Sequence, residues 1–307
     1  MPSIRTFKTF LAVARHGTFA AAGKEIGLTA AAVGLQIRGL EEELDQVLFD
    51  RGPRSVVLNV AGRNIIPEIE ELVLRYEALA AGGDSDELSG TVVMGALVSA
   101  LMGAFADALW SVKREHPRLK VRLFAGMSSD FAYKVEHGEI DAAVVTQSPR
   151  SLPTSLIWTP LYTEPMVLIV PRQPHFTLPD TPLDILRRAP FIRFDRHTWT
   201  GDLVKDVLSQ CKVKACDEME LNSVEAIIEI VRQGFGVSIV PQLTNVHWER
   251  DQDLSVIPLP GIEVERRVGL LERTRHGRMR FTAAIKEYFR EGGSRVAARQ
   301  KLSSRAR

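Results

Sequence analysis

The segment TFAAAGKEIGLTAAAVGLQIRGLEEEL, residues 18–44, decides how the start of the chain folds. Its pattern predicts a short helix, a turn at Gly27 and a longer second helix, the layout of a helix-turn-helix DNA reader. Thr18 and Thr29 stand where a hydroxyl can cap the first free amides of each helix, and we include both in the expected DNA interface. One face of the second helix is an apolar stripe that we expect to be buried: Val33, Ile37, Leu40 and Leu44.

The opposite face of this second helix, which is expected to meet DNA, has few hydrogen-bonding groups. It is formed by Ala30, Ala31, Gly34, Leu35 and Arg38. Alanine and leucine can touch a thymine methyl, but they cannot hydrogen-bond a base edge. Gln36 is then the main side chain expected to make a bidentate base contact, and Arg38 is better placed for phosphate. We therefore expect a sparse reader that depends on a wing, DNA shape and paired dimers.

The segment VLFDRGPRSVVLN, residues 47–59, changes to β character around a Gly-Pro turn, which predicts a small hairpin, or wing. Arg51 and Arg54 flank its tip, where a cation can enter a narrow minor groove or meet phosphate. Two arginines at an exposed turn can also be plain solvated charges. Next to the helix pair, the DNA interpretation is favoured.

A long helix is predicted after Asn59, over residues 60–81. Its apolar residues follow coiled-coil spacing and predict a dimerisation seam: Ile65, Ile69, Leu72, Tyr76 and Leu79. No second helix follows in the sequence to cover this face, and two-fold proteins read two half-sites. The alternative is that the helix packs on its own downstream domain. The polar, glycine-rich segment up to residue 89 predicts a hinge.

From residue 91 onward, β and α patterns alternate, which predicts a mostly parallel sheet covered by helices. Strands are expected at TVVMGAL (91–97), VRLF (121–124), DAAVV (141–145), MVLIV (166–170), FIRF (191–194), VSIV (237–240) and RVGLL (267–271). Joining segments near 160 and 265 suggest two lobes with a cleft between them. Lobe I takes about 90–160 and 266–291, and lobe II about 161–265. The basic tail, 292–307, is expected to be disordered.

The composition is that of an ordinary globular protein, with 307 residues, 45% hydrophobic and 25% charged residues and a net charge of +1. Contact with nucleic acid must therefore be local. Two cysteines, Cys211 and Cys216, are too few for a disulfide scaffold and fit a reducing cytosol. No secretion signal or membrane-length apolar run is seen, so we expect a soluble cytoplasmic protein with no membrane partner.

The order of these segments resembles the LysR-type transcriptional regulators over about residues 3–290. The most specific part is FLAVARHGTFAAAGKEIGLTAAAVGLQIRGLEEEL (10–44), followed by LFDR and LNVAG. The downstream resemblance rests on TVVMGA, GEIDAAVV and SVEAIIEIVRQGFGVSIVP. The resemblance implies an α+β multidomain protein. Its parts would be a winged helix-turn-helix (1–59), a linker helix with hinge (60–89) and a two-lobed, periplasmic-binding-protein-like α/β effector domain (90–291).

The resemblance also implies partners. Such regulators assemble as dimers of dimers on double-stranded promoter DNA, respond to a small metabolite and can contact RNA polymerase. A rival hypothesis is a small-molecule-binding protein whose N-terminal domain serves mainly for dimerisation, which the alanine-rich reading face supports. A gel shift against the protein's own upstream region would separate the two.

In the effector domain we expect a ligand in the cleft, at strand ends where helix N-termini point their amides. Hydroxyls and one aromatic ring fit that position: Ser99, Ser128, Ser129, Thr146, Phe194, Thr198 and Thr200. Together with free amides they would bind a small organic acid or aromatic metabolite. The alternative is that these hydroxyls are ordinary helix caps. Arg193 and Arg196 can supply positive charge, or they can form salt bridges.

Nothing in the sequence favours catalysis. There is no G-x-S-x-G elbow, and the seven histidines are scattered without metal-ligand spacing. We therefore predict no enzyme activity, no metal and no cofactor beyond the small-molecule effector.

Overall fold

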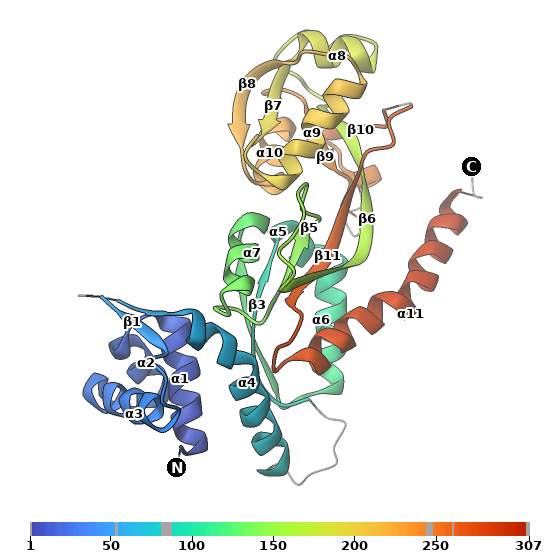
Figure 1. Cartoon of the computed structure of the whole chain (residues 1–307). Helices are drawn as coiled ribbons and strands as arrows, with labels where there is room; N and C mark the ends of the chain where they lie inside the picture. The colour runs from blue at the N-terminus through green and yellow to red at the C-terminus, as the bar shows by residue number, and fades with distance from the viewer. Residues whose placement is uncertain (1, 53–54, 81–87, 244–247, 260, 305–307) are drawn as a thin grey trace.

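The computed structural model describes residues 2–52, 55–80, 88–243, 248–259 and 261–304. Figure 1 shows a small N-terminal module beside an elongated domain of two lobes, with one long helix between them. None of the described helices is long and apolar enough to cross a membrane.

Three helices and a short hairpin form the N-terminal module, which confirms the winged helix-turn-helix. The helices are α1 (Ile4–His16), α2 (Phe19–Ile26) and α3 (Ala30–Glu43), and the antiparallel strands are β1 (Phe49–Arg51) and β2 (Val56–Leu58). Thr18 and Thr29 cap α2 and α3, each accepting a hydrogen bond from the backbone N–H three residues further on. Gly27 ends α2 with φ 71°, a left-handed conformation that glycine adopts at little cost.

The linker helix α4 (Val60–Ala80) packs against its own N-terminal module. Ile66, Ile69 and Val73 are buried in one apolar cluster with α1 and α3, and Ile65 is partly buried there. The predicted dimerisation role of Ile69 is therefore wrong, because α1, which precedes α4 in the chain, lies beside it and covers that face. The expectation that no helix was available to cover it considered only the sequence that follows.

Two residues of the predicted dimerisation seam are exposed on the surface of α4. Leu72 and Tyr76 are each 51% exposed. The side chain of Leu79 lies outside the described part of the chain. The apolar surface of α4 that is available for the predicted self-association is thus shorter than the sequence suggested.

A different side of α4 contacts the two-lobed domain through a salt bridge and a hydrogen bond. The Glu70 carboxylate lies 3.3 Å from the Arg273 guanidinium and accepts a 3.1 Å hydrogen bond from the Gly277 N–H. Both charged side chains are buried. Arg273 also donates to the carbonyl oxygens of Val135 and Ile140. The alternative raised from the sequence, that the linker helix packs on its own downstream domain, holds at this contact.

The main sheet has the strand order β10-β6-β11-β5-β3-β4, with β9 also paired to β6. Its strands are β3 (Gly90–Ala96), β4 (Leu119–Ala125), β5 (Ala142–Thr146), β6 (Leu156–Pro171), β9 (Ser238–Pro241), β10 (Leu254–Ile257) and β11 (Glu265–Arg273). Among the described strands of this sheet, only β3, β4 and β5 pair in parallel. The prediction of a mostly parallel sheet is therefore wrong. Strands β6 and β11 carry the chain to lobe II and back, so they run in opposite directions.

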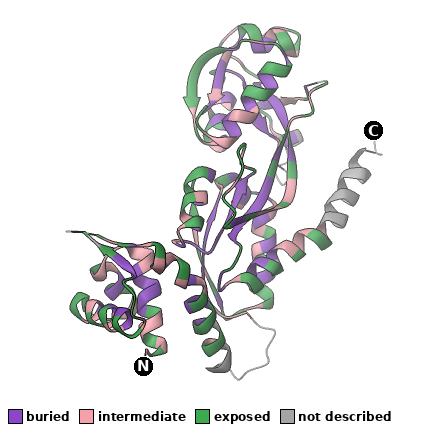
Figure 2. Ribbon diagram, in the orientation of Figure 1, coloured by how far each residue is buried: buried purple, intermediate pink, exposed green. Residues whose placement is uncertain are grey.

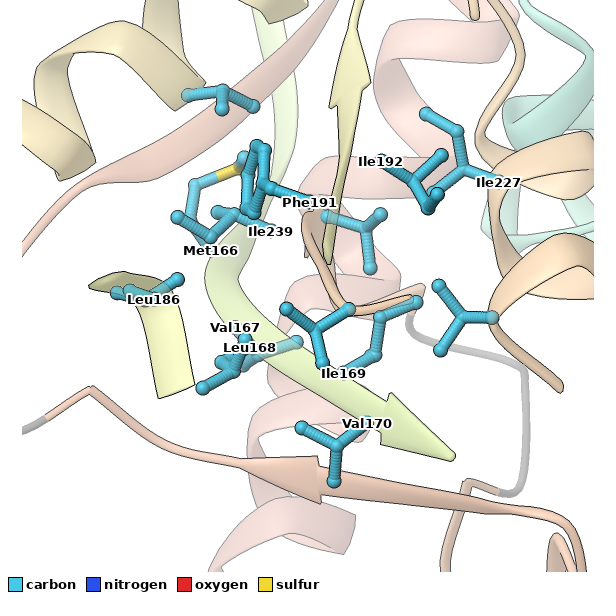
Figure 3. Close-up of a cluster of buried hydrophobic side chains, with 14 of the residues drawn as sticks. Met166, Val167, Leu168, Ile169, Val170, Leu186, Phe191, Ile192, Ile227 and Ile239 are labelled. Atoms are coloured by element: carbon cyan, nitrogen blue, oxygen red, sulfur yellow. The ribbon is translucent and has the colours of Figure 1, made fainter. Parts of the chain in front are cut away.

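Lobe II also has a small parallel sheet of β7 (Pro190–Phe194) and β8 (Cys216–Leu221). Its helices are α8 (Pro182–Arg188), α9 (Trp199–Gln210) and α10 (Val224–Arg232), with a 3-10 turn, η1, at Trp248–Arg250. Figure 3 shows the apolar core that joins them, formed by β6, β7, β9 and neighbouring helices. Figure 2 shows that the strands at the centre of both lobes are buried.

The helices of lobe I are α5 (Val98–Leu101), α6 (Ala104–Glu115), α7 (Ser128–Glu136) and α11 (Met279–Ser304). The apolar pattern from Ser99 to Glu115 is that of one helix, but the structure divides it into α5 and α6 at Gly103, whose backbone is extended. Helix α11 continues to Ser304, so the expectation of a disordered tail is wrong for residues 292–304. Alanine, arginine, lysine and glutamine in this segment are strong helix formers, and the two glycines at its start do not stop the helix.

Candidate effector cavity and DNA-binding face

The exposed face of α3 presents Ala31, Leu35 and Arg38, as the sequence predicted. Leu35 is 74% exposed, the highest value among the large apolar side chains of the described chain. Ala30 is exposed at the start of the helix, and Gly34 lies beside the Phe19 ring of α2. The hydroxyls of Thr18 and Thr29 accept from the backbone amides of Ala21 and Ala32.

Gln36 is placed differently from its predicted role. Its Oε1 lies 2.6 Å from the hydroxyl of Thr9, a residue of α1 with no exposed surface. At about 100° per residue, position 36 falls on the flank of α3 that meets α1, rather than on the outer face. The expected bidentate base contact is corrected on this ground, because the side-chain carbonyl already accepts a hydrogen bond from Thr9.

The wing is formed by β1 and β2, with Asp50 opposite Val57 in the ladder. Arg51 is the last residue of β1, and its side chain lies outside the described set. Arg54 also lies outside the described residues. The DNA contacts predicted for these two arginines stay predictions.

A cavity of about 250 Å³ lies between the two lobes. Six of the residues predicted to bind ligand line it: Ser99, Ser128, Ser129, Phe194, Thr198 and Thr200. Ser99, Ser128 and Thr200 are buried. The segments that bring them together are the starts of α5, α7 and α9 and the end of β7.

Thr146 does not line this cavity. Its N–H donates to the Ser128 Oγ at 3.1 Å, and its Oγ1 lies 3.4 Å from the Thr200 Oγ1. Thr146 therefore supports two lining hydroxyls from behind, and its predicted direct contact with ligand is corrected. The reason is that Thr146, the last residue of β5, is only 1% exposed, and its polar groups face Ser128 and Thr200.

Three helices of nine or more residues begin at the cavity wall, namely α7, α9 and α10. Thr198 caps α9 and Ser223 caps α10, each accepting a backbone N–H. Helix α7 instead follows Met127, which makes no side-chain cap. Its first amides therefore remain able to bind an anion, which the helix dipole also favours.

The positive charge of the cavity does not come from the predicted arginines. The Arg193 Nε donates to Asp217 at 2.7 Å, and Arg196 pairs with Asp217 and Glu220. Neither arginine lines the cavity. Their salt-bridge alternative holds, because β8 places acidic residues directly beside them.

Arg266 lines the cavity and was missed from the sequence. It stands opposite Glu164 in the β11–β6 ladder, and the Arg266 Nε donates to Glu164 at 2.8 Å. Each of the two residues is 1% exposed. The sequence offered one signal for this site, because Arg266 is a charged residue at the start of an apolar strand. Its partner Glu164, however, lies 102 residues away in the sequence, so no local pattern reveals the pair.

The other lining residues that sequence reasoning missed come from the segments that lead into α7 and α10 and from the first turns of α9 and α10. They include Met127, Trp199, Asn222, Ser223 and Glu225. Ser223 is recognisable in the sequence only as a helix cap, and the others give no local signal. No cluster of three or more histidine, cysteine or acidic residues with metal-binding geometry was found among the described residues.

Comparison with protein families gives two matches. Residues 85–294 match the LysR substrate binding domain, and residues 4–63 match the bacterial regulatory helix-turn-helix protein of the lysR family. A protein named "Probable RuBisCO transcriptional regulator" from Cyanophora paradoxa is 29% identical over 276 residues, covering 83% of each chain. A protein of the same name from Nostoc sp. is 29% identical over 267 residues, covering 85% of this chain and 79% of the relative.

Solved structures share the fold at low identity. Full-length OxyR from Pseudomonas aeruginosa superposes with a TM-score of 0.69 at 18% identity, covering 94% of each chain. Full-length CbnR complexed with its target DNA gives a TM-score of 0.55 at 19% identity, covering 93% of this chain and 99% of that one. Because the substrate-binding-domain model alone spans more than half of the residues, the chain belongs to the LysR family of transcriptional regulators and is not an enzyme.

Proposed function

We propose that this regulator binds promoter DNA through the outer face of α3 and the wing, and that a small organic anion in the cavity between the lobes controls this binding. The observation that supports the proposal is the convergence of three helix starts and several hydroxyls on one small cavity. Helix starts and hydroxyls together form a natural carboxylate site. The volume, about 250 Å³, suits a ligand smaller than the drug-sized ones that occupy roughly 300–1,000 Å³.

The DNA contacts that we propose are of two kinds. Leu35 and the alanines of α3 would meet thymine methyls, and Arg38 with the wing arginines would meet phosphate or the minor groove. Because Gln36 is held against α1, base-specific hydrogen bonds would be fewer than the sequence suggested. Specificity would then come from DNA shape and from the spacing of paired half-sites.

Self-association is proposed through the exposed part of α4, at Leu72 and Tyr76, with dimers pairing into a tetramer. Placement in the cytoplasm and contact with RNA polymerase follow from the regulatory role and remain parts of the proposal. The relatives are named as regulators of RuBisCO, but at 29% identity their targets do not transfer to this chain. The protein's own upstream region is therefore the first DNA to test.

A gel shift with that DNA tests the DNA-binding half of the proposal. Affinity should fall as salt rises, because binding releases counterions from the phosphates. Arg38→Ala should weaken binding to all sequences and reduce the slope of log K against log salt by about 1. Arg187→Ala, an exposed arginine of α8 in lobe II, is the matched control. The absence of any shift at low salt would contradict the proposal.

A thermal-shift screen of small carboxylates and aromatic acids tests the ligand half. Binders should raise the unfolding temperature of the full chain, and Ser99→Ala should reduce that rise because it removes a buried lining hydroxyl. Ser111→Ala on α6, which does not line the cavity, should leave the rise unchanged. If no acid stabilises the protein, the anion site is refuted.

A further inference from the structure

The two sides of the cavity differ in charge and in hydrogen-bonding capacity. Lobe I presents the uncapped start of α7 together with Ser99 and Ser128. Lobe II presents the start of α10 with Glu225. We propose, resting on the function proposed above, that the effector is a zwitterion-like small acid. Its carboxylate would lie at the start of α7 and its ammonium or other strong donor at Glu225.

The lobe I side is suited to an acceptor. The Ser128 Oγ accepts from the Thr146 N–H, so its own proton remains to donate into the cavity. Within the described chain, the hydroxyl of Ser99 has no protein partner. The first amides of α7 receive no side-chain cap, and a helix start favours negative charge. Each of these groups gains a partner when a carboxylate enters from the cavity.

The lobe II side is suited to a donor. The Glu225 Oε2 accepts a 2.6 Å hydrogen bond from the Ser223 hydroxyl. Its Oε1 is shielded from solvent and has no hydrogen-bond partner in the described structure. An ionised carboxylate can only accept, and a buried acceptor without a partner is costly. A donor on the ligand would remove that cost.

The cavity offers no cation that could neutralise a second carboxylate. Arg266 is the single lysine or arginine among its described lining residues, and its guanidinium is already bonded to the buried Glu164. Because Glu164 neutralises Arg266, the carboxylate of Glu225 is the one charge of the described lining that has no opposite charge beside it. A simple dicarboxylate would place like charges against each other, whereas an amino acid or aminated ring acid would place opposite charges together.

A carboxylate in the first turn of a helix is often there only to complement the helix dipole. That explains the charge of Glu225 at the start of α10. It does not explain why this carboxylate lines a cavity while one oxygen stays unpaired. Glu229, one turn later, shows the ordinary arrangement, because both of its oxygens are bonded to neighbours at the surface, the half-buried Arg232 and the exposed Gln233.

The test uses matched sets of acids that differ only at one end. The first set is pentanoate, glutarate and 5-aminopentanoate, and the second is benzoate, terephthalate and 4-(aminomethyl)benzoate. Each is titrated calorimetrically into the full-length protein. In at least one set, the aminated acid should bind at least about ten-fold more tightly than either of the other two acids, because it adds a charge-assisted hydrogen bond.

Two variants of Glu225 sharpen the test. Glu225→Gln keeps the shape but removes the charge, so the preference for the aminated acid should fall about ten-fold and the dicarboxylate should gain. Glu225→Asp keeps the charge at a shorter reach, so the aminated acid should weaken but still rank first. Glu229→Gln on the same helix does not line the cavity and should change neither order nor affinity.

The results distinguish a failure of the zwitterion inference from a failure of the anion site proposed above. If all members of a set bind equally and Ser99→Ala weakens them, the anion site stands and the zwitterion inference is overturned. If no acid of either set binds, both are overturned. An unchanged preference in a folded Glu225→Gln protein, checked by its melting curve, also overturns the inference.

Discussion

Two buried arginines on one strand, Arg266 and Arg273 of β11, have similar chemistry and different consequences. Each is paired with a buried glutamate. Glu164 belongs to the neighbouring strand β6, so the Arg266 pair lies wholly inside the effector domain, at the cavity. Glu70 belongs to the linker helix α4, so the Arg273 pair joins the effector domain to the helix that carries the DNA reader.

The comparison shows that one strand, β11, contributes both to the cavity and to the contact with the distant helix α4. Seven residues of extended chain span about 24 Å at ~3.4 Å per residue. Strand β11 therefore leads directly from the cavity to the contact that holds α4. Between the two arginines, the β11–β6 register shifts at Val268/Gly269. The cavity and the contact with the linker helix are thus formed by residues of a single strand.

The largest effect is expected from breaking the Arg266 pair. Arg266→Met leaves Glu164 buried without its cation, which should reduce the free energy of unfolding by about 3–5 kcal/mol. The matched double variant, with Glu164→Met added, should recover most of the loss, because no uncompensated charge remains. Urea unfolding of the full chain measures both. A double variant as unstable as the single one would show that the charge pair is not the cause.

Breaking the Arg273 pair should reduce the free energy of unfolding by less than breaking the Arg266 pair. It should, however, loosen the contact between α4 and the effector domain. Glu70→Gln should reduce the unfolding free energy by about 2–3 kcal/mol, because Arg273 keeps two carbonyl partners. The same variant should make α4 more accessible to protease, since it loosens the contact with the effector domain. Glu71→Gln, an exposed neighbour paired with Arg75, is the control. Equal behaviour of the two variants would remove the special role of Glu70.

The link between the two arginines can be distorted directly. A Cβ at Gly269 would lie 2.3 Å from the Trp158 ring and 2.5 Å from the Thr159 carbonyl oxygen. Gly269→Ala should therefore cost about 1–3 kcal/mol by overpacking, measured by thermal or urea unfolding. Gly39→Ala on α3 has open space around the new Cβ and should not destabilise the protein. Matching losses at both positions would contradict the packing argument.

The last prediction concerns pH at the Arg273 end of the strand. Burial would raise the pKa of Glu272, but hydrogen bonds from His276 and Lys286 prevail and lower it from 4.5 to about 2. Because the folded pKa is depressed, this carboxylate stabilises the protein above pH 4.5, and that contribution is lost as the pH falls towards 2. Glu272→Gln should flatten the pH dependence of stability in this window, as followed by urea unfolding. An unchanged dependence would assign the acid sensitivity elsewhere.

The helix-turn-helix could be predicted because its signals are local. Thr18, Gly27 and Thr29 act on backbone groups within three or four residues, so their roles follow from the sequence around them. Gln36 shows where local reasoning stops. Its partner, Thr9, lies on another helix, 27 residues away, and only packing decides which flank of α3 that helix covers.

The same division applies to the cavity. Ser99, Ser128 and Thr198 were predicted because hydroxyls near helix starts form a recognisable pattern, and the lobes bring those starts together. Arg266 and Glu225 were missed because an isolated charged residue in a strand or a first helical turn has many ordinary explanations. Which of them faces a cavity depends on partners such as Glu164 that are distant in the chain.

By itself, the sequence determined the winged helix-turn-helix, the linker helix and the alternating α/β pattern, because caps, glycine turns and apolar periodicity act over one or two helical turns. Only the tertiary structure decided that Ile69 is covered by α1, that β6 and β11 run antiparallel, and that Glu70 holds Arg273. These features depend on which surfaces meet when elements far apart in the chain pack together. No short-range pattern encodes that choice.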